Sequence, residues 1–225
     1  MLDKLIRYGA VADILGPNSQ GTILEVGAGP HGLGCCLPYP FTGVDTWYPT
    51  PPLPQNRAVR ASGTDLPFAD QSFDYVLCIE VMEHLPVDLR RKIVSEMCRV
   101  CRKQVIITHP YGKVARCGDK FLGVVYDSLK PLGQSRPWWL VEHLLNPYPE
   151  PGEYLNGTTE GFRILRQGQE NGIIHPGLIF FTNLKVVARR IAKSYARRPR
   201  FWLSLVRLIH FPPYCRVMVT LERKP

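Results

Sequence analysis

A short apolar run followed by three glycines constrains the fold of this chain more than any other stretch. Residues 23–26 (ILEV) are typical of a buried β-strand, and they end in Gly27-Ala28-Gly29-Pro30-His31-Gly32, with the glycines spaced G-x-G-x-x-G. Such glycines let a strand turn tightly and let its backbone approach a nucleotide-like ligand. We therefore predict a ligand site at the carboxyl end of this strand, with Gly27, Ala28 and Gly29 in contact with the ligand. The spacing alone does not separate NAD, FAD and S-adenosylmethionine (SAM) sites.

Two acidic residues narrow the choice of ligand. Glu25 lies two residues before the first glycine, where a carboxylate would repel a pyrophosphate but suits a ligand that carries an ammonium and a sulfonium group. A second apolar run, residues 41–45, ends in Asp45, a position from which a carboxylate accepts hydrogen bonds from ribose hydroxyls. Both residues favour SAM over a dinucleotide, and we predict that Asp45 binds the ribose.

Two later motifs complete a pattern that covers residues 5–111. The string DLPF occupies residues 65–68, and residues 80–86 (EVMEHLP) follow the apolar run 73–79. With the glycine loop and Asp45 before them in order, the chain resembles the class I SAM-dependent methyltransferases, and within them the small-molecule type with DLPF and EHLP motifs. The resemblance implies SAM as the cofactor, a glycine loop that cradles its methionine part, and Asp65 and Leu66 at the adenine. We also count Glu80 among the cofactor-binding residues.

The apolar runs and the resemblance together predict one α/β domain over residues 1–225. We expect a Rossmann-like, mostly parallel seven-stranded sheet with helices on both faces and a helical insertion before the last strand. The first helix is predicted near residues 2–14 and another at 87–101. Residues 112–160 are predicted to be irregular substrate-side loops with one short helix near 138–145. The last two strands, near 162–165 and 215–221, would form an antiparallel hairpin interrupted by the insertion, residues 168–213.

The excess positive charge lies at the carboxyl-terminal end of the chain. The formal net charge is +9, yet residues 1–177 carry 17 Lys and Arg against 18 Asp and Glu, whereas residues 178–225 carry 11 against 1. A basic amphipathic pattern at 178–196 followed by an apolar one at 200–210 is typical of an element that lies on an anionic membrane. A cap packed on the domain, with its charges in solvent, has the same pattern, and RNA is a further open alternative for the basic stripe.

Other features bear on localisation and metals. The chain has no apolar run of 18 residues and does not begin like a signal peptide, so we expect a cytoplasmic protein, peripheral on the inner face of the membrane if residues 178–210 bind lipid. Seven irregularly placed cysteines do not suggest a disulfide framework. Cys98 and Cys101 form a C-x-x-C without a second pair at zinc-like spacing, so the sequence predicts no metal site.

Methyl transfer from a sulfonium is a direct displacement, and alignment in a dry pocket supplies most of the catalysis. A base is needed only when the acceptor must lose a proton. Three histidines are candidate bases, namely His84, His109 and His143. His109 is the favoured one because it ends a predicted parallel strand at the ligand edge, whereas His84 is expected to brace its loop and His143 follows Glu142.

The predicted function is SAM-dependent transfer of a methyl group to a small-molecule or lipid-linked acceptor. A non-catalytic SAM-binding partner protein at the membrane surface would keep the same motifs. An NAD-dependent oxidoreductase is disfavoured by Glu25 and by the two later motifs. We expect no DNA substrate. Nucleic-acid methyltransferases that attack an exocyclic amine resemble each other in a D/N-P-P-Y element, which residues 79–82 lack. The chain also has no Pro-Cys pair of the kind found in cytosine C5 enzymes.

Overall fold

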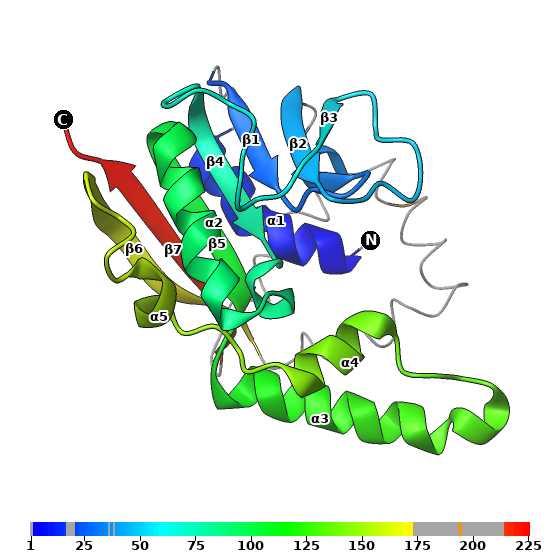
Figure 1. Ribbon diagram of the computed structural model, residues 1–225. Coiled ribbons are helices and arrows are strands. Elements are labelled where there is room, and N and C mark those ends of the chain that lie inside the picture. The colour runs from blue at the N-terminus through cyan, green and yellow to red at the C-terminus, as the bar shows by residue number, and fades with distance from the viewer. Residues whose placement is uncertain (1, 17–20, 36, 38, 173–193, 195–213) are drawn as a thin grey trace.

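The computed structural model describes residues 2–16, 21–35, 37, 39–172, 194 and 214–225, and its centre is a seven-stranded sheet (Figure 1). The strand order is β3-β2-β1-β4-β5-β7-β6. Strands β1 to β5 are parallel, and β7 runs antiparallel to both β5 and β6. The predicted mostly parallel sheet is thereby confirmed. The strand bounds are β1 Ile23–Val26, β2 Phe41–Asp45, β3 Asn56–Arg60, β4 Phe73–Ile79, β5 Cys101–Pro110, β6 Phe162–Gly172 and β7 Tyr214–Arg223.

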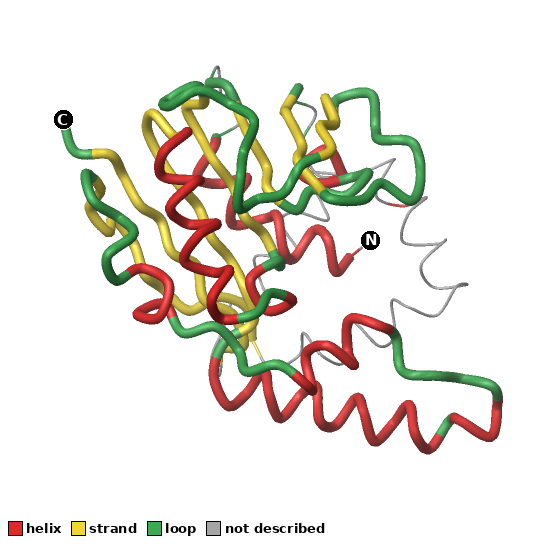
Figure 2. Tube along the Cα trace, in the orientation of Figure 1, coloured by secondary structure: helices red, strands yellow, loops and turns green. Residues whose placement is uncertain are grey.

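Helices cover both faces of the sheet, as predicted (Figure 2). Helix α1 (Leu2–Leu15) places Tyr8 and Val11 in a buried apolar cluster on one face. Helix α2 (Val87–Val100) places Ile93 and Met97 in a second cluster on the other face. Because parallel strands are buried on both sides, their sequences read as continuous apolar runs. The remaining elements are α3 (Gly112–Ser128), α4 (Trp138–Leu145), α5 (Pro151–Leu155) and the short 3-10 turns η1 (Gly32–Cys35), η2 (Met82–His84) and η3 (Lys130–Leu132).

Helix α3 corrects the prediction that residues 112–160 are irregular apart from one short helix. It spans 17 residues, and its buried positions Ala115, Asp119 and Leu122 recur at helical spacing. The sequence did not predict this helix because the glycines and β-branched valines within it have low helix propensity. Helix α3 lies beside α4, whose bounds match the predicted short helix (Figure 1). Packing between these two helices therefore overrides local propensity.

The antiparallel end of the sheet is longer than expected. Strand β6 continues to Gly172, beyond the predicted end at residue 165, because its backbone pairs with β7 along nearly its whole length. Apart from the ends of these strands and residue 194, the predicted insertion 168–213 lies outside the described residues, and so do the expected helices at 178–196 and 200–210. Among the described helices, none combines the length and the apolar character that crossing a bilayer requires.

Candidate functional site

A cavity of about 550 Å³ lies at the carboxyl ends of β1, β2 and β4, between these strands and helix α4. Ligand sites of open parallel sheets occupy this edge. A smaller cavity of about 170 Å³ adjoins it and shares Arg7, Gly27 and Glu80 with it. The larger cavity is lined by, among others, Gly27, Asp45, Ser62, Gly63, Thr64, Glu80, Val81, Glu83, His84, Trp138, Trp139, Glu142 and His143.

Gly27 stands where the two cavities meet. Its φ is +77°, and a Cβ added there would lie 2.2 Å from Cγ2 of Val81. Both the backbone conformation and the space therefore require glycine. The amide of Gly27 donates to the Val44 carbonyl at 2.8 Å, which ties the loop to the end of β2. Ala28, the next residue, lines the smaller cavity, so the structure places two of the three predicted loop residues at a cavity wall.

Glu25 supports the glycine loop from inside the protein. Its side chain is fully buried, and it lines neither cavity. One carboxylate oxygen accepts a hydrogen bond from the Tyr8 hydroxyl at 2.5 Å and the other accepts from the Leu33 amide at 2.6 Å. A Cβ on Gly32 would lie 2.4 Å from this second oxygen. The structure thus gives Glu25 an internal bracing role, which differs from the expected direct contact with a charged ligand.

Asp45 lines the larger cavity at the end of β2, where the sequence predicts it. Its Oδ2 accepts from the Gly29 amide at 2.9 Å and its Oδ1 accepts from the Trp47 amide at 3.1 Å. Each carboxylate oxygen can accept more than one hydrogen bond. The two backbone amides therefore orient the carboxylate and leave it able to accept hydrogen bonds from a diol. Gly29 itself does not line either cavity and acts through this contact.

The segment after β3 meets the cavity at different residues from those expected. Ser62, Gly63 and Thr64 line it, whereas Asp65 and Leu66 do not. Leu66 is buried in the apolar core beside α2, and Asp65 is exposed. The resemblance implied contacts from the DLPF string, but here that string anchors the segment and the three preceding residues line the cavity.

Glu80 carries an unusual backbone and a buried ion pair. It lines both cavities at the end of β4, with a φ of +57°, which is uncommon for a residue with a side chain. Its Oε1 accepts from Nε of Arg216 at 2.9 Å, and Nη2 of the same guanidinium binds Oε2. Both side chains are buried. Sequence reasoning missed Arg216, whose only signal was a basic residue inside the apolar run of β7.

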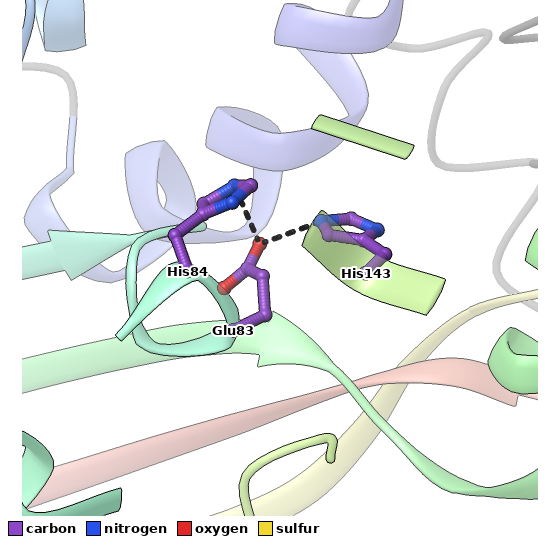
Figure 3. Close-up of side chains that lie close together, drawn as sticks. All are labelled: Glu83, His84 and His143. Carbon is purple, nitrogen blue, oxygen red and sulfur yellow. Dashed lines mark ion pairs between the residues drawn. The ribbon is translucent and has the colours of Figure 1, made fainter. Parts of the chain in front are cut away.

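Two of the three candidate histidines come together at the cavity wall (Figure 3). His84, from η2, contacts Oε2 of Glu142 through Nδ1 at 2.6 Å. His143, from α4, contacts Oδ2 of Asp119 through Nδ1 at 2.8 Å. Burial lowers the pKa of His84, and the neighbouring His143 lowers it further. Glu83 lies between the two rings, and burial followed by the proximity of Glu80 raises the pKa of Glu83 well above its usual range.

The turn that carries Glu83 and His84 is held by a buried arginine. Nε of Arg90 donates to the Met82 carbonyl at 3.1 Å and to the Leu85 carbonyl at 3.2 Å. Its other nitrogens bind Glu153 at 3.0 Å and the Pro147 carbonyl at 2.8 Å. Arg90 thus connects the turn after β4 to the segment after α4, which fixes the two histidine-bearing elements relative to each other.

His109, the base favoured by the sequence, is not at either cavity. It is fully buried, its Nδ1 lies 2.8 Å from the Pro110 carbonyl oxygen, and its Nε2 lies 2.9 Å from the Tyr154 hydroxyl. A carbonyl only accepts, so Nδ1 carries the proton and Nε2 accepts from Tyr154. Both ring nitrogens are therefore used inside the core, because the end of β5 is covered by α5. The structure corrects the expectation that His109 faces the acceptor.

The burial of His109 predicts a pH dependence of stability. Desolvation lowers the pKa of His109 from 6.5 to about 4, so the unfolded chain binds one more proton than the folded protein between these values. The free energy of unfolding should therefore fall as the pH falls through this window, by up to about 1.4 kcal/mol per pH unit. Urea unfolding of wild type and His109→Gln at pH 7 and pH 5 measures the difference. The exposed His31→Gln is the control, and an equal pH response in wild type and His109→Gln would contradict the assignment.

Comparison with known proteins shows what the sequence of this chain is similar to. Residues 24–108 match the family model described as a methyltransferase domain. A protein of Mycobacterium sp. (strain KMS), named a methyltransferase, is 40% identical over 92 residues, which cover 36% of this chain and 34% of that protein. The match thus spans about a third of the length of the curated relatives.

Solved structures share the fold over nearly the whole chain. A TehB-like SAM-dependent methyltransferase of Corynebacterium glutamicum has a TM-score of 0.51 at 14% identity, with 99% of this chain and 87% of that chain covered. The 1,6-didemethyltoxoflavin-N1-methyltransferase of Burkholderia thailandensis, solved with S-adenosylhomocysteine (SAH), has a TM-score of 0.52 at 12% identity, with 99% and 80% covered. At these identities the likeness shows the fold.

Proposed function

We propose that this chain, which carries a methyltransferase domain with the class I SAM-dependent fold, transfers a methyl group from SAM to a small-molecule or lipid-linked acceptor. The resemblance and the fold expected from the sequence are both confirmed. The observation that supports the proposed reaction is the larger cavity. Gly27 and Asp45 lie on its sheet side, and His84 and His143 lie on its α4 side, so that a cofactor and an acceptor share one space.

The residues present fit SAM. The cavity of about 550 Å³ has the size of small-molecule and cofactor sites, roughly 300–1,000 Å³. Asp45 offers acceptors for the ribose hydroxyls, and residues 62–64 form the adjoining wall for the adenine. In the smaller cavity, Arg7 offers a cation and Glu80 a carboxylate to the two charged groups of an amino acid. We accordingly assign the adenine contact to Ser62, Gly63 and Thr64 instead of Asp65 and Leu66.

The chain's own residues would position the cofactor and the acceptor. When bound, SAM supplies an electrophilic methyl group attached to a sulfonium. The glycine loop would hold the methionine part of the cofactor and Asp45 its ribose, and Trp138 and Trp139 of α4 form an apolar wall opposite the sheet. His84 and His143 are the polar groups that an acceptor hydroxyl or amine meets on this wall. Alignment at near-attack distance in such a partly dry space supplies much of the rate enhancement.

Calorimetric titration with SAH and, separately, with NADH tests the cofactor. Micromolar binding of SAH without binding of NADH is the expected result. Binding of neither compound would contradict the proposal, and binding of NADH alone would favour the oxidoreductase alternative. If SAH binds but the protein never converts SAM to SAH with any of a panel of acceptors, the non-catalytic partner protein becomes the better interpretation.

Asp45→Ala should weaken SAH binding by about 10- to 100-fold. The expected change follows from losing charge-assisted hydrogen bonds, which are worth ~1.5–3 kcal/mol. Asp65→Ala is the matched control, because Asp65 is exposed and lines neither cavity, so its SAH affinity should equal that of wild type. Calorimetry of both variants decides between the assignments: a loss in Asp65→Ala with none in Asp45→Ala would contradict the one made here.

A further inference from the structure

A second chemical feature of the larger cavity is a cluster of Glu83, His84 and His143 (Figure 3). One ligand atom from each residue can be chosen so that all three lie within 4.8 Å of one another. Glu83 and His84 come from η2, whereas His143 comes from α4, 59 residues beyond His84 in the chain. The side chain of Glu83 is 1% exposed and that of His143 is 10% exposed. The cluster is therefore built from two elements and is largely shielded from solvent.

The orientation of both imidazole rings is set by carboxylates outside the cluster. Nδ1 of His84 contacts Glu142 at 2.6 Å, and Nδ1 of His143 contacts Asp119 at 2.8 Å. A carboxylate accepts a hydrogen bond from Nδ1–H, so the remaining nitrogen of each neutral ring, Nε2, carries a lone pair. Histidines that bind metals show this arrangement, with the second ring nitrogen donating to a carboxylate.

The Nε2 atoms of both rings lie near the same carboxylate oxygen. Nε2 of His143 lies 3.8 Å from Oε1 of Glu83, and Nε2 of His84 lies 3.9 Å from it. Within the described part of the chain, Nε2 of His143 and Oε2 of Glu83 are buried and have no hydrogen-bond partner. Buried polar atoms without partners are costly, so a cation bound within reach of Nε2 of His143 and of the Glu83 carboxylate would offset this cost.

The distances suit a cation better than a proton. A hydrogen bond would bring nitrogen and oxygen to about 2.7–3.2 Å. Two atoms that each bind one cation at ~2.0–2.2 Å with a tetrahedral angle are separated by roughly 3.3–3.6 Å. The values of 3.8 and 3.9 Å are nearer to this second range than to the first. Two further carboxylates, Glu142 and Asp119, contact the two imidazole rings.

We propose that Glu83, His84 and His143 bind a divalent first-row transition metal ion in the larger cavity. Two imidazole nitrogens and one carboxylate are the donor set of catalytic zinc and non-haem iron sites, which keep coordination positions open. Magnesium prefers an all-oxygen shell and is not the expected ion. This proposal departs from the prediction that the chain holds no metal, which was drawn from the missing second pair beside Cys98 and Cys101.

An ion in this position has its open coordination sites toward the cavity. The three ligands form one wall of the cavity, while Gly27 and Asp45 lie on the side of the sheet. The role of the ion rests on the proposed methyl transfer: the ion would hold an oxygen atom of the acceptor, such as a hydroxyl or carboxylate oxygen. Metal binding itself does not depend on that role, so it is measured without SAM or SAH.

The test is a titration of the chelator-treated protein with Co²⁺, followed by visible absorption, and then displacement by Zn²⁺. Wild type should bind one Co²⁺ with a ligand-field band and release it to Zn²⁺ but not to an equal concentration of Mg²⁺. Glu83→Gln and His143→Ala should lose the band, and Asp119→Asn should weaken Co²⁺ binding by about 10- to 100-fold, as changes to outer partners do. Cys117→Ser removes an exposed thiol as a control and should leave the titration unchanged.

The outcomes separate the two proposals. Absence of the band in wild type would overturn the metal site, and so would equal Co²⁺ affinity in wild type, Glu83→Gln and His143→Ala. His84→Ala supplies a further variant at the more exposed ligand, and circular dichroism confirms that each variant is folded. Calorimetry with SAH is run on the same preparations. SAH binding without Co²⁺ binding would leave the methyl-transfer proposal standing, whereas Co²⁺ binding without SAH binding would leave only the metal site.

Discussion

Replacing Arg216 with methionine is expected to lower the free energy of unfolding by about 3–5 kcal/mol, the scale found when one partner of a buried ion pair is removed. Glu80 and Arg216 are 3% and 5% exposed, and the guanidinium binds both carboxylate oxygens. Without it the Glu80 carboxylate would stay buried beside Glu83 and lose the guanidinium that binds both of its oxygens. Urea unfolding followed by circular dichroism measures the change. SAH affinity should fall as well, because Glu80 lines both cavities.

An exposed ion pair that also involves β7 supplies the control. Arg163 of β6 binds Glu222 of β7, with side chains 61% and 30% exposed. Arg163→Met should therefore cost at most about 1 kcal/mol. The double variant Glu80→Gln with Arg216→Met should recover much of the lost stability, because it removes the unpaired charge. If Arg216→Met and Arg163→Met lowered the free energy of unfolding by the same small amount, Glu80 would not need its partner, and the stabilising role given to the buried pair would be wrong.

Gly27→Ala is expected to reduce SAH affinity by about 100-fold, equivalent to about 2.8 kcal/mol. A side chain at a φ of +77° costs about 1–2 kcal/mol by itself. In addition, the new Cβ would lie 2.2 Å from Cγ2 of Val81, so the turn after β4 must move away from the glycine loop. That turn lines the cavity through Glu80, Val81, Glu83 and His84, and the cofactor contacts move with it. Calorimetry with SAH and urea unfolding measure the two effects.

Gly29→Ala is the matched control for the steric contact between residue 27 and Val81. Gly29 also has a positive φ, +54°, but a Cβ there would meet no atom within 4 Å. It should therefore show only the conformational cost, about 1–2 kcal/mol in stability. Combining Gly27→Ala with Val81→Ala removes the clashing methyl groups and should restore part of the SAH affinity. Equal loss in Gly27→Ala and Gly29→Ala, with no recovery in the double variant, would show that the contact with Val81 is unimportant.

Features carried by short segments were predictable from the sequence. The strand before the glycine loop, the acid at the end of β2 and helix α4 each depend on neighbouring residues, and the structure has all three. Asp45 lies at the cavity because the carboxyl ends of parallel strands meet at one edge of the sheet. Its role toward the ribose stays a prediction until SAH binding is measured.

Features that depend on distant partners were not predictable. Helix α3 forms although its glycines disfavour a helix, because its buried face packs against α4 and β7. His109 and His143 are both candidate bases in the sequence, yet α5 covers the first and the second lines the cavity. The pairing of Glu80 with Arg216 joins residues 136 positions apart.

The sequence by itself determined the order of strands along the chain, the glycine turn and the family resemblance, since these follow from local periodicity and motif spacing. Only the tertiary structure decided which side chains share the cavity: residues 62–64 instead of Asp65 and Leu66, and Glu83, His84 and His143 together without His109. The physical reason is that burial and hydrogen-bond partners arise when elements distant in the chain pack together, and these contacts set where each polar group points.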